Sequence, residues 1–381
     1  MFYKHEFSFY VILVSKEKIM NIGIIGGGIS GVYAALQIKE LHPNYNVEII
    51  DHNDKLNKKI YATGNGRCNF ANSSSLEGKY SNPNFALPIL KEHTYEDIIK
   101  YFNHIGIPST FEGNNVYPMS KCASTVGLMM EERVNQLGIK VKLNTKIIDY
   151  KANNGGVIVH TNNGDFKYDK IVIALGGKSS SQLGSDGSGF ELLKKQGYQI
   201  TNLSPVLCPV KTKENTKLVD GVRSQVVLST YSGNTLLNKE EGELLFKDKG
   251  ISGIVVFNAT HYVNIANRKD ITFHVDFTPF VKGAIKMDDY ISYVNPKLAK
   301  YLIDNKLDIH NTVFAFKDFY DFSVAHVTHG GLSINEVNDS LESKKEKNIY
   351  FIGEILDVDG ICGGYNMMWA FASAYHVAKR I

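Results

Sequence analysis

The pattern of apolar and polar positions becomes regular directly after Met20. "NIGIIG" is a continuous apolar run, glycines follow it, and Val32, Ala35 and Leu36 then recur at helical spacing. A second apolar run, "VEIID", comes next. A buried strand, a glycine turn, a helix with an apolar face and a second strand are typical of a βαβ unit with parallel strands.

Further along the chain, helical spacing covers residues 84–104 and, more clearly, residues 123–137, with Gly138 as a helix stop. The short segments "KVKL", "IIDYKA", "GVIVHT" and "DFKY" are broken by turn pairs such as "NNGG" and predict a small antiparallel meander. "DKIVIALGG" returns to a buried parallel strand, and "SGFELLKKQG" predicts a helix with Ser188 and Glu191 at capping-box spacing.

The pattern changes character from about residue 205 to about residue 322. It mixes strands, charges and an amphipathic helical part near residues 286–305, which predicts an inserted mixed α+β domain. The last segment, residues 323–381, returns to the first pattern with a buried strand, "KNIYFIGE", and the helix "GGYNMMWAFASAYHVAKRI". The predicted fold class is therefore α/β, with a Rossmann-like domain that has a parallel sheet and a β-meander.

Residues 1–19 precede this organisation. Their apolar run "FSFYVILV" is too short to span a bilayer, and no small-residue cleavage site follows it. Since Met20 stands directly before the first strand, we interpret residues 1–19 as an N-terminal extension. An added edge strand is the alternative.

Composition narrows the possible partners. The chain is 43% apolar and 21% charged, as in globular proteins, and its formal net charge of +3 is too small for an electrostatic nucleic-acid or membrane footprint. The four cysteines are far apart and form no Cys-x-x-Cys pair or zinc-type cluster: Cys68, Cys122, Cys208 and Cys362. We therefore expect no disulfide scaffold and no metal site, and a cytoplasmic location fits best.

The glycines after the first strand have the spacing of a dinucleotide-binding turn, Gly26-x-Gly28-x-x-Gly31. The first makes the tight turn, the second admits a pyrophosphate against the backbone, and the third lets helix and strand approach. Asp51 follows the second strand, where a carboxylate can hold ribose hydroxyls. The alternative is a glycine-rich turn with an acidic surface residue.

Two later segments favour FAD over a nicotinamide cofactor held by the first unit alone, because an extended FAD molecule must also be held at its flavin end. "IALGGKS" runs from a strand into Gly176 and Gly177, and "IGEILDVDGICGGYN" runs from a strand into Gly353 and Glu354 before a helix that starts near Gly363. Glu354 suits ribityl hydroxyls. The N-terminus of the helix suits the N1/O2 edge of the isoalloxazine, where negative charge collects on reduction.

Residues 64–70, "GNGRCNF", have a loop composition that suits a bound cofactor. A dithiol centre needs a second cysteine close to Cys68, and the next cysteine is Cys122, so we interpret Cys68 as a shape element rather than a nucleophile. Arg67 could bring positive charge to the phosphates or to the reduced flavin, with a loop salt bridge as the alternative. Asn69 offers both donors and an acceptor.

Together these motifs resemble the YhiN/BaiN-type flavoproteins, a family of NAD(P)/FAD-dependent oxidoreductases with aminoacetone-oxidase-like members. The resemblance covers nearly all of residues 20–381, and its most specific block is "GEILDVDGICGGYN". It implies a two-segment FAD-binding domain, residues 20–204 and 323–381, and an inserted substrate domain, residues 205–322. The motifs and the resemblance give these expected FAD-binding residues: Gly26, Gly28, Ser30, Gly31, Asp51, Gly66, Arg67, Cys68, Asn69, Ile147, Gly176, Gly177, Gly353, Glu354, Gly363, Gly364, Tyr365 and Asn366.

The chemistry of this family is varied and includes amine oxidation and reduction of steroid-like enones. The chain departs from the family's usual residues at five positions expected near the flavin: Asn65, His329, Cys362, Met367 and Met368. The resemblance therefore implies the cofactor better than it implies the substrate.

Catalytic residues stay open, with Arg67, His329 and Tyr365 as candidates and with His326 and Asp359 favoured as structural or loop residues. We expect an FAD-dependent oxidoreductase that transfers hydride between flavin and a small organic substrate or NAD(P)H. NAD(P)H use is implied only by the resemblance, because no second Gly-x-Gly-x-x-Gly is present. The alternative is an FAD-containing binding or RNA-modification-associated flavoprotein with little redox turnover, against which the near-neutral charge stands.

Overall fold

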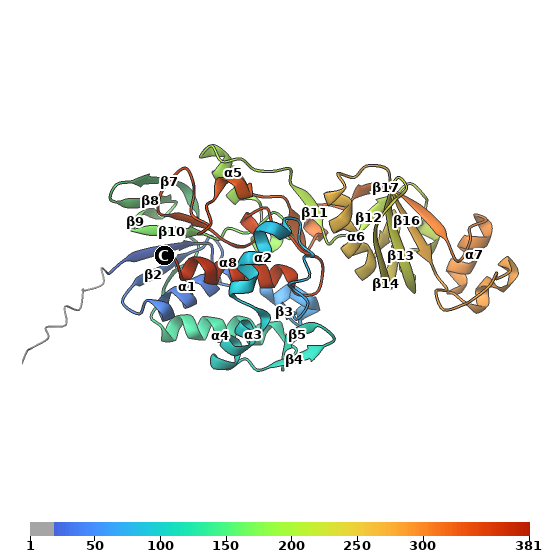
Figure 1. Ribbon diagram of the computed structural model, residues 1–381, viewed down its shortest axis with the longest axis horizontal. Helices are drawn as coiled ribbons and strands as arrows, with labels where there is room; N and C mark the ends of the chain where they lie inside the picture. The colour runs from blue at the N-terminus through green and yellow to red at the C-terminus, as the bar shows by residue number, and fades with distance from the viewer. Residues whose placement is uncertain (1–18) are drawn as a thin grey trace, which may run out of the picture.

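The computed structural model describes residues 19–381, so the prediction for the N-terminal extension lies outside the described residues except for Ile19. Figure 1 shows two regions along the long axis of the molecule, which we call the sheet region and the barrel region. Within residues 19–381, no helix combines the length and the apolar character needed to cross a bilayer.

A five-stranded parallel sheet, in the order β19-β10-β1-β2-β6, forms the centre of the sheet region. Its strands are β1 (Asn21–Ile25), β2 (Asn46–Ile50), β6 (Lys140–Lys142), β10 (Lys170–Ile173) and β19 (Ile349–Phe351). In the centre, Ile24 pairs with Ile49 on one side and with Val172 on the other. Continuous apolar runs form these strands because the centre of the sheet is buried on both faces.

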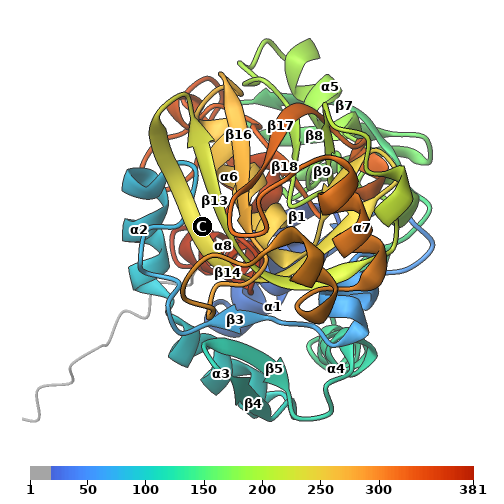
Figure 2. The same ribbon diagram turned by 90° about the vertical axis from the view of Figure 1, so that its right-hand side faces the viewer.

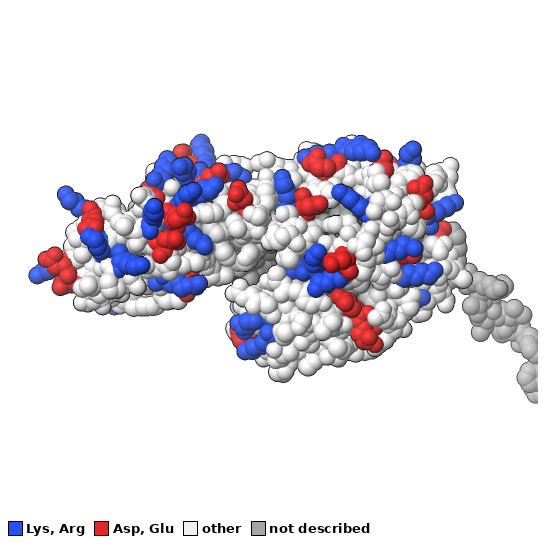
Figure 3. Space-filling view, turned by 180° about the vertical axis from the view of Figure 1, so that it is seen from behind, with Lys and Arg blue, Asp and Glu red and all other residues white. Residues whose placement is uncertain are grey.

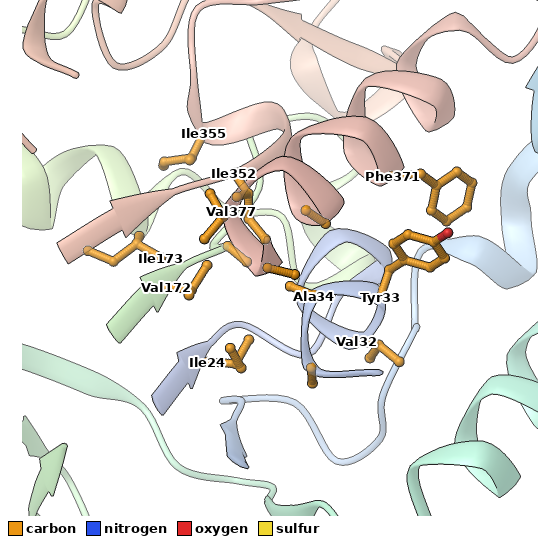
Figure 4. Close-up of a cluster of buried hydrophobic side chains, with 14 of the residues drawn as sticks. Ile24, Val32, Tyr33, Ala34, Val172, Ile173, Ile352, Ile355, Phe371 and Val377 are labelled. Atoms are coloured by element: carbon orange, nitrogen blue, oxygen red, sulfur yellow. The ribbon is translucent and has the colours of Figure 1, made fainter. Parts of the chain in front are cut away.

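Helices α1 (Ile29–Leu41) and α8 (Tyr365–Ala378) pack against each other and on the sheet. Figure 4 shows their contact, in which Tyr33 of α1 and Phe371 of α8 lie close together on the side of α1 away from Ile24 and Val172 of the strands. The two aromatic rings lie 4.8 Å apart between centroids. The predicted βαβ unit and the predicted C-terminal helix are both confirmed.

The predicted meander is only partly correct. Strands β7 (Ile147–Asn153), β8 (Gly156–Thr161) and β9 (Gly164–Tyr168) form the antiparallel sheet, but the first expected segment, "KVKL", does not join it. That segment is β6, which pairs in parallel with β2, placing Val141 opposite Ile49. It follows α4 (Ala123–Gln136), so the chain completes a second strand–helix–strand crossover, and this tertiary pairing outweighs the local turn signals.

Two predicted helical features differ in detail. The helical stretch 84–104 is two helices, α2 (Pro83–Glu92) and α3 (Tyr95–His104), because Thr94 and Asp97 form a capping box that starts a new helix. In α5 (Ser188–Lys195) the expected capping box is absent. Gly187 is the N-cap, and Asp186 accepts the N–H of Ser188 instead.

A further sheet of the sheet region consists of β3 (Ala71–Asn72), β4 (Ser109–Glu112) and β5 (Asn115–Pro118).

The barrel region is a closed six-stranded barrel with its own apolar core. Its strands are β12 (Val210–Thr212), β13 (Arg223–Ser232), β14 (Thr235–Lys247), β15 (Gly250–Ser252), β16 (Ile271–Asp276) and β17 (Thr312–Phe319). Figure 2 faces the barrel, with α6 (Ile254–Ile265) behind β13 and β16 and α7 (Pro296–Asp304) at its side. The helix expected near residues 286–305 is interrupted, because Asn295 caps α7 and Pro296 occupies its first turn after a 3-10 turn, Met287–Ser292.

The chain enters and leaves the barrel region through two adjacent strands, β11 (Ser204–Val206) and β18 (Val327–His329), which pair in antiparallel fashion. Figure 3 shows that basic and acidic side chains are interspersed over both regions on the face seen from behind. No large field of one sign covers that face, in agreement with the small net charge of +3.

Candidate functional site

The end of β1 turns into α1 through glycines that have different tasks. Gly26 has a φ of +115°, and a Cβ there would collide with the carbonyl oxygen of Ala174. A Cβ at Gly31 would collide with the carbonyl oxygen of Gly26, whereas a Cβ at Gly28 would meet nothing within 4 Å. No side chain caps the first turn of α1. Gly28 therefore leaves open space beside free helix N–H groups, which suits a phosphate.

Asp51 is held at the end of β2 by backbone groups. Its Oδ2 accepts the N–H of Gly27 at 2.5 Å, and its Oδ1 accepts the N–H of Asn53 at 2.6 Å. The carboxylate borders a small hollow that Ile147 and Leu175 also line. The structure therefore brings together the glycine turn, Asp51 and Ile147, three sequence-predicted parts of a nucleotide site.

Two polar side chains near this turn are buried without a hydrogen-bond partner in residues 19–381. They are Asn57, with both side-chain amide atoms, and Ser185, with its hydroxyl. The N–H of Asn57 donates to the carbonyl of Gly27 at 2.8 Å, and Ser185 lies next to Gly176, whose φ is +69°. Because buried polar atoms are nearly always paired, these orphaned groups fit a polar ligand that binds beside the glycine turns.

The loop "GNGRCNF" has a backbone that few sequences could adopt. Gly64, Asn65, Gly66 and Cys68 all have φ values between +54° and +80°. A Cβ at Gly66 would meet nothing within 4 Å. Cys68 is fully buried, and burial raises its pKa to about 12, so its thiol stays protonated near neutral pH. This agrees with a shape role for Cys68.

Arg67 is engaged by protein groups at the surface of this loop. Its guanidinium lies 2.5 Å from the carboxylate of Glu112 and stacks over the ring of Tyr117 at 4.4 Å. Lys121 binds the other oxygen of Glu112. The loop salt bridge, which was the alternative interpretation, is the arrangement that Arg67 has here.

The start of α8 lies against the same loop. Gly364, with a φ of +91°, is the N-cap of α8, and no side chain caps the helix. A Cβ at Gly364 would lie 2.7 Å from the carbonyl oxygen of Ala71 and 3.0 Å from the side chain of Asn69. Asn72 donates to the carbonyl of Gly363 at 2.6 Å. Two expected flavin-end segments, residues 64–70 and 363–366, are thus adjacent.

Tyr365 and Asn366 are anchored in the protein. The Tyr365 hydroxyl donates to the carbonyl of Ser74 at 3.1 Å, and the side chain is buried. The side-chain oxygen of Asn366 accepts the N–H of Gly360, and its amide donates to the Gly360 carbonyl, both at 2.9 Å. These bonds hold the turn before α8, and Tyr365 contacts neither Arg67 nor His329 through any of them.

Glu354 joins three segments at the end of β19. Its Oε1 accepts the N–H of Thr328 at 2.8 Å, and Lys59 lies 3.1 Å from its Oε2. A Cβ at Gly177 would lie 2.5 Å from both Glu354 and Thr328, and a Cβ at Gly353 would lie 2.7 Å from the hydroxyl of Ser30. The glycines at these positions let α1, β10 and β19 approach one another closely.

Asp359 is a fully buried carboxylate between two histidines. Its Oδ1 lies 2.7 Å from Nδ1 of His329, and its Oδ2 lies 2.9 Å from Nδ1 of His261. Burial alone would raise the pKa of Asp359, but the hydrogen bonds from both histidines outweigh it and lower the pKa. Burial lowers the pKa of His329, yet its bond to Asp359 and the charge of Asp359 prevail and raise the pKa.

Sequence reasoning named His329 as a candidate but favoured a loop role for Asp359 and did not single out His261. No sequence motif links His261 to Asp359, because they lie 98 positions apart and meet where α6 of the barrel region packs against the sheet region. Asn258 and His261 are three positions apart on α6, and this spacing could have indicated a shared polar helix face. Asn258 also contacts the C-terminal segment, because its side-chain oxygen accepts the N–H of Cys362.

Known proteins share this chain's sequence and fold. Residues 20–380 match the family described as "HI0933-like protein Rossmann domain". The chain is 30% identical to a 3-dehydro-bile acid delta(4,6)-reductase of Clostridium scindens, over 93% of this chain and 97% of that protein. It is 26% identical to a ribosomal RNA dihydrouridine synthase of Haemophilus influenzae, over 94% of this chain and 97% of that protein.

The fold is similar to that of a solved structure, 3-ketosteroid delta1-dehydrogenase from Sterolibacterium denitrificans in complex with 1,4-androstadiene-3,17-dione. The TM-score is 0.52 at 10% identity, over 95% of this chain and all of that chain. The predicted α/β fold class is confirmed, and so is the resemblance on which the cofactor expectation was based. The chain belongs to the HI0933-like Rossmann family of flavoprotein oxidoreductases.

Proposed function

We propose that this protein is an FAD-dependent reductase of a carbon–carbon double bond conjugated to a carbonyl group. The observation that carries the proposal is the chain's 30% identity, over nearly its whole length, to a delta(4,6)-reductase of 3-dehydro-bile acids. A 3-dehydro-delta(4,6) bile acid is a dienone, and dihydrouridine is uridine with the double bond next to a carbonyl saturated. The names of both relatives thus describe the same type of bond change.

The described residues fit FAD. Gly28 and the uncapped start of α1 suit the pyrophosphate, Asp51 suits the ribose, and the hollow beside Ile147 suits the adenine. At the other end, Glu354 suits the ribityl hydroxyls, and the uncapped α8 start at Gly364 suits the N1/O2 edge of the flavin. Bound and reduced, FAD would supply the hydride.

The chain's own groups would bind, orient and protonate the substrate. The free N–H groups and dipole of α8 stabilise negative charge near its start, which favours the reduced cofactor. The barrel region would cover the site and exclude water, since α6 packs on the C-terminal segment through Asn258 and His261.

The proposed reductant of the flavin is NAD(P)H. The proposed location is the cytoplasm, because all four cysteines are free.

A second candidate substrate is a uridine of ribosomal RNA. Its support is the 26% identity to a ribosomal RNA dihydrouridine synthase over 94% of this chain. A small-molecule enone is the first choice, because the identity to the bile acid reductase is higher and because the face in Figure 3 carries no basic field that would hold RNA phosphates.

The test is an anaerobic oxidation experiment. The purified chain is loaded with FAD, reduced, and mixed either with a 3-keto-delta(4,6) bile acid or with unmodified ribosomal RNA, while the flavin absorbance is followed. Return of the oxidised spectrum with the bile acid, together with a product that has gained two hydrogens, supports the proposal. Return with RNA alone moves the function to the second candidate. A chain that does not retain FAD, or that reacts with neither, overturns it.

A further inference from the structure

The cluster His329–Asp359–His261 joins three segments that are remote in sequence. His329 ends β18, Asp359 precedes α8, and His261 lies in α6 of the barrel region. The backbone of Asp359 is fixed by Ser81, which donates its N–H to the Asp359 carbonyl at 2.8 Å and accepts the Asp359 N–H with its hydroxyl at 3.0 Å. The carboxylate is therefore held at both its backbone and its side chain.

The two histidines differ in how far their rings, and with them the Nε2 atoms, are exposed. An ionised carboxylate only accepts hydrogen bonds, so Nδ1 of each ring carries the hydrogen that it gives to Asp359. His261 is 1% exposed, whereas the side chain of His329 is 21% exposed. Among residues 19–381, Nε2 of His329 has no hydrogen-bond partner. In its protonated form, the ring of His329 can present Nε2–H to a bound molecule, whereas the ring of His261 is buried.

The position of His329 relates it to the expected flavin end. The backbone N–H of its neighbour Thr328 donates to Glu354, and the hydroxyl oxygen of Thr328 accepts the N–H of Lys178 at 2.7 Å. Glu354 is the residue that suits the ribityl chain, so His329 stands one residue from the cofactor-side contacts. Asp359, which His329 contacts through one carboxylate oxygen, contacts His261 of α6 in the barrel region through the other.

We propose that His329 donates the proton in the double-bond reduction and that Asp359, held on its other side by His261, is the positioning residue of His329. This inference rests on the proposed function. Asp359 orients the ring so that Nε2 points away from the buried carboxylate, and it stabilises the imidazolium. His261 fixes the rotation of the carboxylate and makes that orientation depend on the seating of the barrel region.

The step balances as follows. A hydride from the reduced flavin adds to the carbon β to the carbonyl, and the proton on Nε2 of His329 adds to the α carbon. The π bond breaks, two C–H bonds form, the flavin is left oxidised, and the imidazole is left neutral until it takes a proton from water. A reduced nicotinamide, or another two-electron donor, restores the flavin.

Burial and three charged groups act on the pKa of His329, and they set the expected pH behaviour. Burial and Arg268 lower its pKa, while Asp359 and Asp357 raise it. Because the protonated ring is the active form, the rate of proton donation falls as the pH rises through this pKa. Removing the charge of Asp359 should move that fall to lower pH.

The experiment compares His329→Gln, Asp359→Asn and His261→Gln with two matched controls, His160→Gln and Asp165→Asn. His160 and Asp165 form a similar pair on the meander, with Nδ1 2.8 Å from Oδ1, but their side chains are 31% and 62% exposed. First, ring-labelled histidine NMR titrates FAD-loaded protein without substrate. Then the reduced protein is mixed with the bile acid enone over a range of pH, and reoxidation of the flavin is timed.

We expect Asp359→Asn to lower the pKa of His329 and the controls to leave it unchanged. His329→Gln should slow reoxidation by the enone roughly 10²-fold or more, with FAD still bound. Asp359→Asn should slow reoxidation less than this and should move the fall of the rate at high pH to lower pH. His261→Gln should change the His329 pKa and the pH profile of the rate in the same directions, but by smaller amounts.

An unchanged His329 pKa in both Asp359→Asn and His261→Gln, or a wild-type rate and pH profile in His329→Gln, would overturn the inference. If Asp359→Asn does not fold, His261→Gln decides, since it leaves Asp359 and His329 in place. Failure of the wild-type reduced protein to react with the enone contradicts the proposed function instead, and the NMR titration still reports separately whether Asp359 controls His329.

Discussion

The core of the sheet region and the interface with the barrel region each hold a histidine largely away from water, with opposite results. His93 lies between α1 and α8, where its Nε2 and the Tyr33 hydroxyl form a hydrogen bond of 2.7 Å and its ring stacks on Tyr375 at 4.1 Å. Burial lowers the pKa of His93 to about 4. His329 has a carboxylate on Nδ1, and its pKa is raised. The partner, rather than burial, decides which of the two rings holds its proton more strongly.

This difference separates structural from chemical use of the same side chain. A neutral histidine that closes an aromatic cluster holds two helices together, whereas a charged histidine with a free Nε2 can give a proton. The second arrangement is costly, because a buried carboxylate must be paired. His261 and His329 each bond one carboxylate oxygen of Asp359, while Ser81 holds its backbone.

The largest expected effect comes from removing the partner that makes His329 unlike His93. Asp359→Ala leaves two histidines around an unfilled buried space, and we expect the free energy of unfolding near pH 7 to fall by about 3–5 kcal/mol. Urea unfolding measures it. Asp165→Ala, which removes the carboxylate of the exposed His160 pair, should change it by less than about 1 kcal/mol. Equal losses in the two variants would contradict the special role of the interface.

The same cluster predicts a dependence of stability on pH. The pKa of Asp359 is lowered by folding, so its contribution is present above the ordinary carboxyl pKa of about 4 and is lost as the pH falls further. The pKa of His329 is raised, so its contribution is present below about 6.5 and is lost as the pH rises through the folded value. Asp359→Asn should remove both dependences, which unfolding curves at several pH values would measure.

His93 should produce a dependence of stability on pH that is opposite to that of His329. Its pKa is about 4 in the folded protein and near 6.5 in the unfolded chain, so the unfolded chain binds more protons between these values. Stability should fall by roughly 2–3 kcal/mol as the pH is lowered from 7 to 4. His93→Gln should flatten this slope while leaving the His329 titration unchanged. A slope that persists in His93→Gln would assign the proton uptake to another group.

The glycine turn gives a smaller and more local contrast. Gly31→Ala places a methyl group against the carbonyl of Gly26 and should cost about 1–3 kcal/mol of stability. Gly28→Ala adds its methyl group in open space, so the apoprotein should unfold as the wild type does, but FAD should bind more weakly. Unfolding of the apoprotein and FAD titration separate the two. Wild-type FAD affinity in Gly28→Ala would contradict the assignment of this space to the pyrophosphate.

The sequence predicted the parts of the molecule whose partners are close in the chain. The turn from Gly26 to Gly31, the position of Asp51 and the helix from Tyr365 depend on local spacing, and the structure has them as expected. The membership of β6 in the parallel sheet and the bond from His261 to Asp359 depend on which distant segments pack together. Periodicity identifies a buried face, but it does not identify the element that covers that face.

The smallest expected effect concerns Arg67. It tests whether the ion pair between Arg67 and Glu112 persists when FAD is bound, as the pair between His329 and Asp359 is expected to. Arg67 and Glu112 are both 38% exposed, so Arg67→Gln should leave urea unfolding of the apoprotein close to that of the wild type. Lys121→Gln removes the other partner of Glu112 and is the matched control. If Arg67 stays on Glu112 when FAD is bound, both variants should bind FAD equally well in a titration. If it turns to the cofactor, only Arg67→Gln should weaken binding. A loss confined to Arg67→Gln would therefore move this arginine from the loop salt bridge to the FAD site.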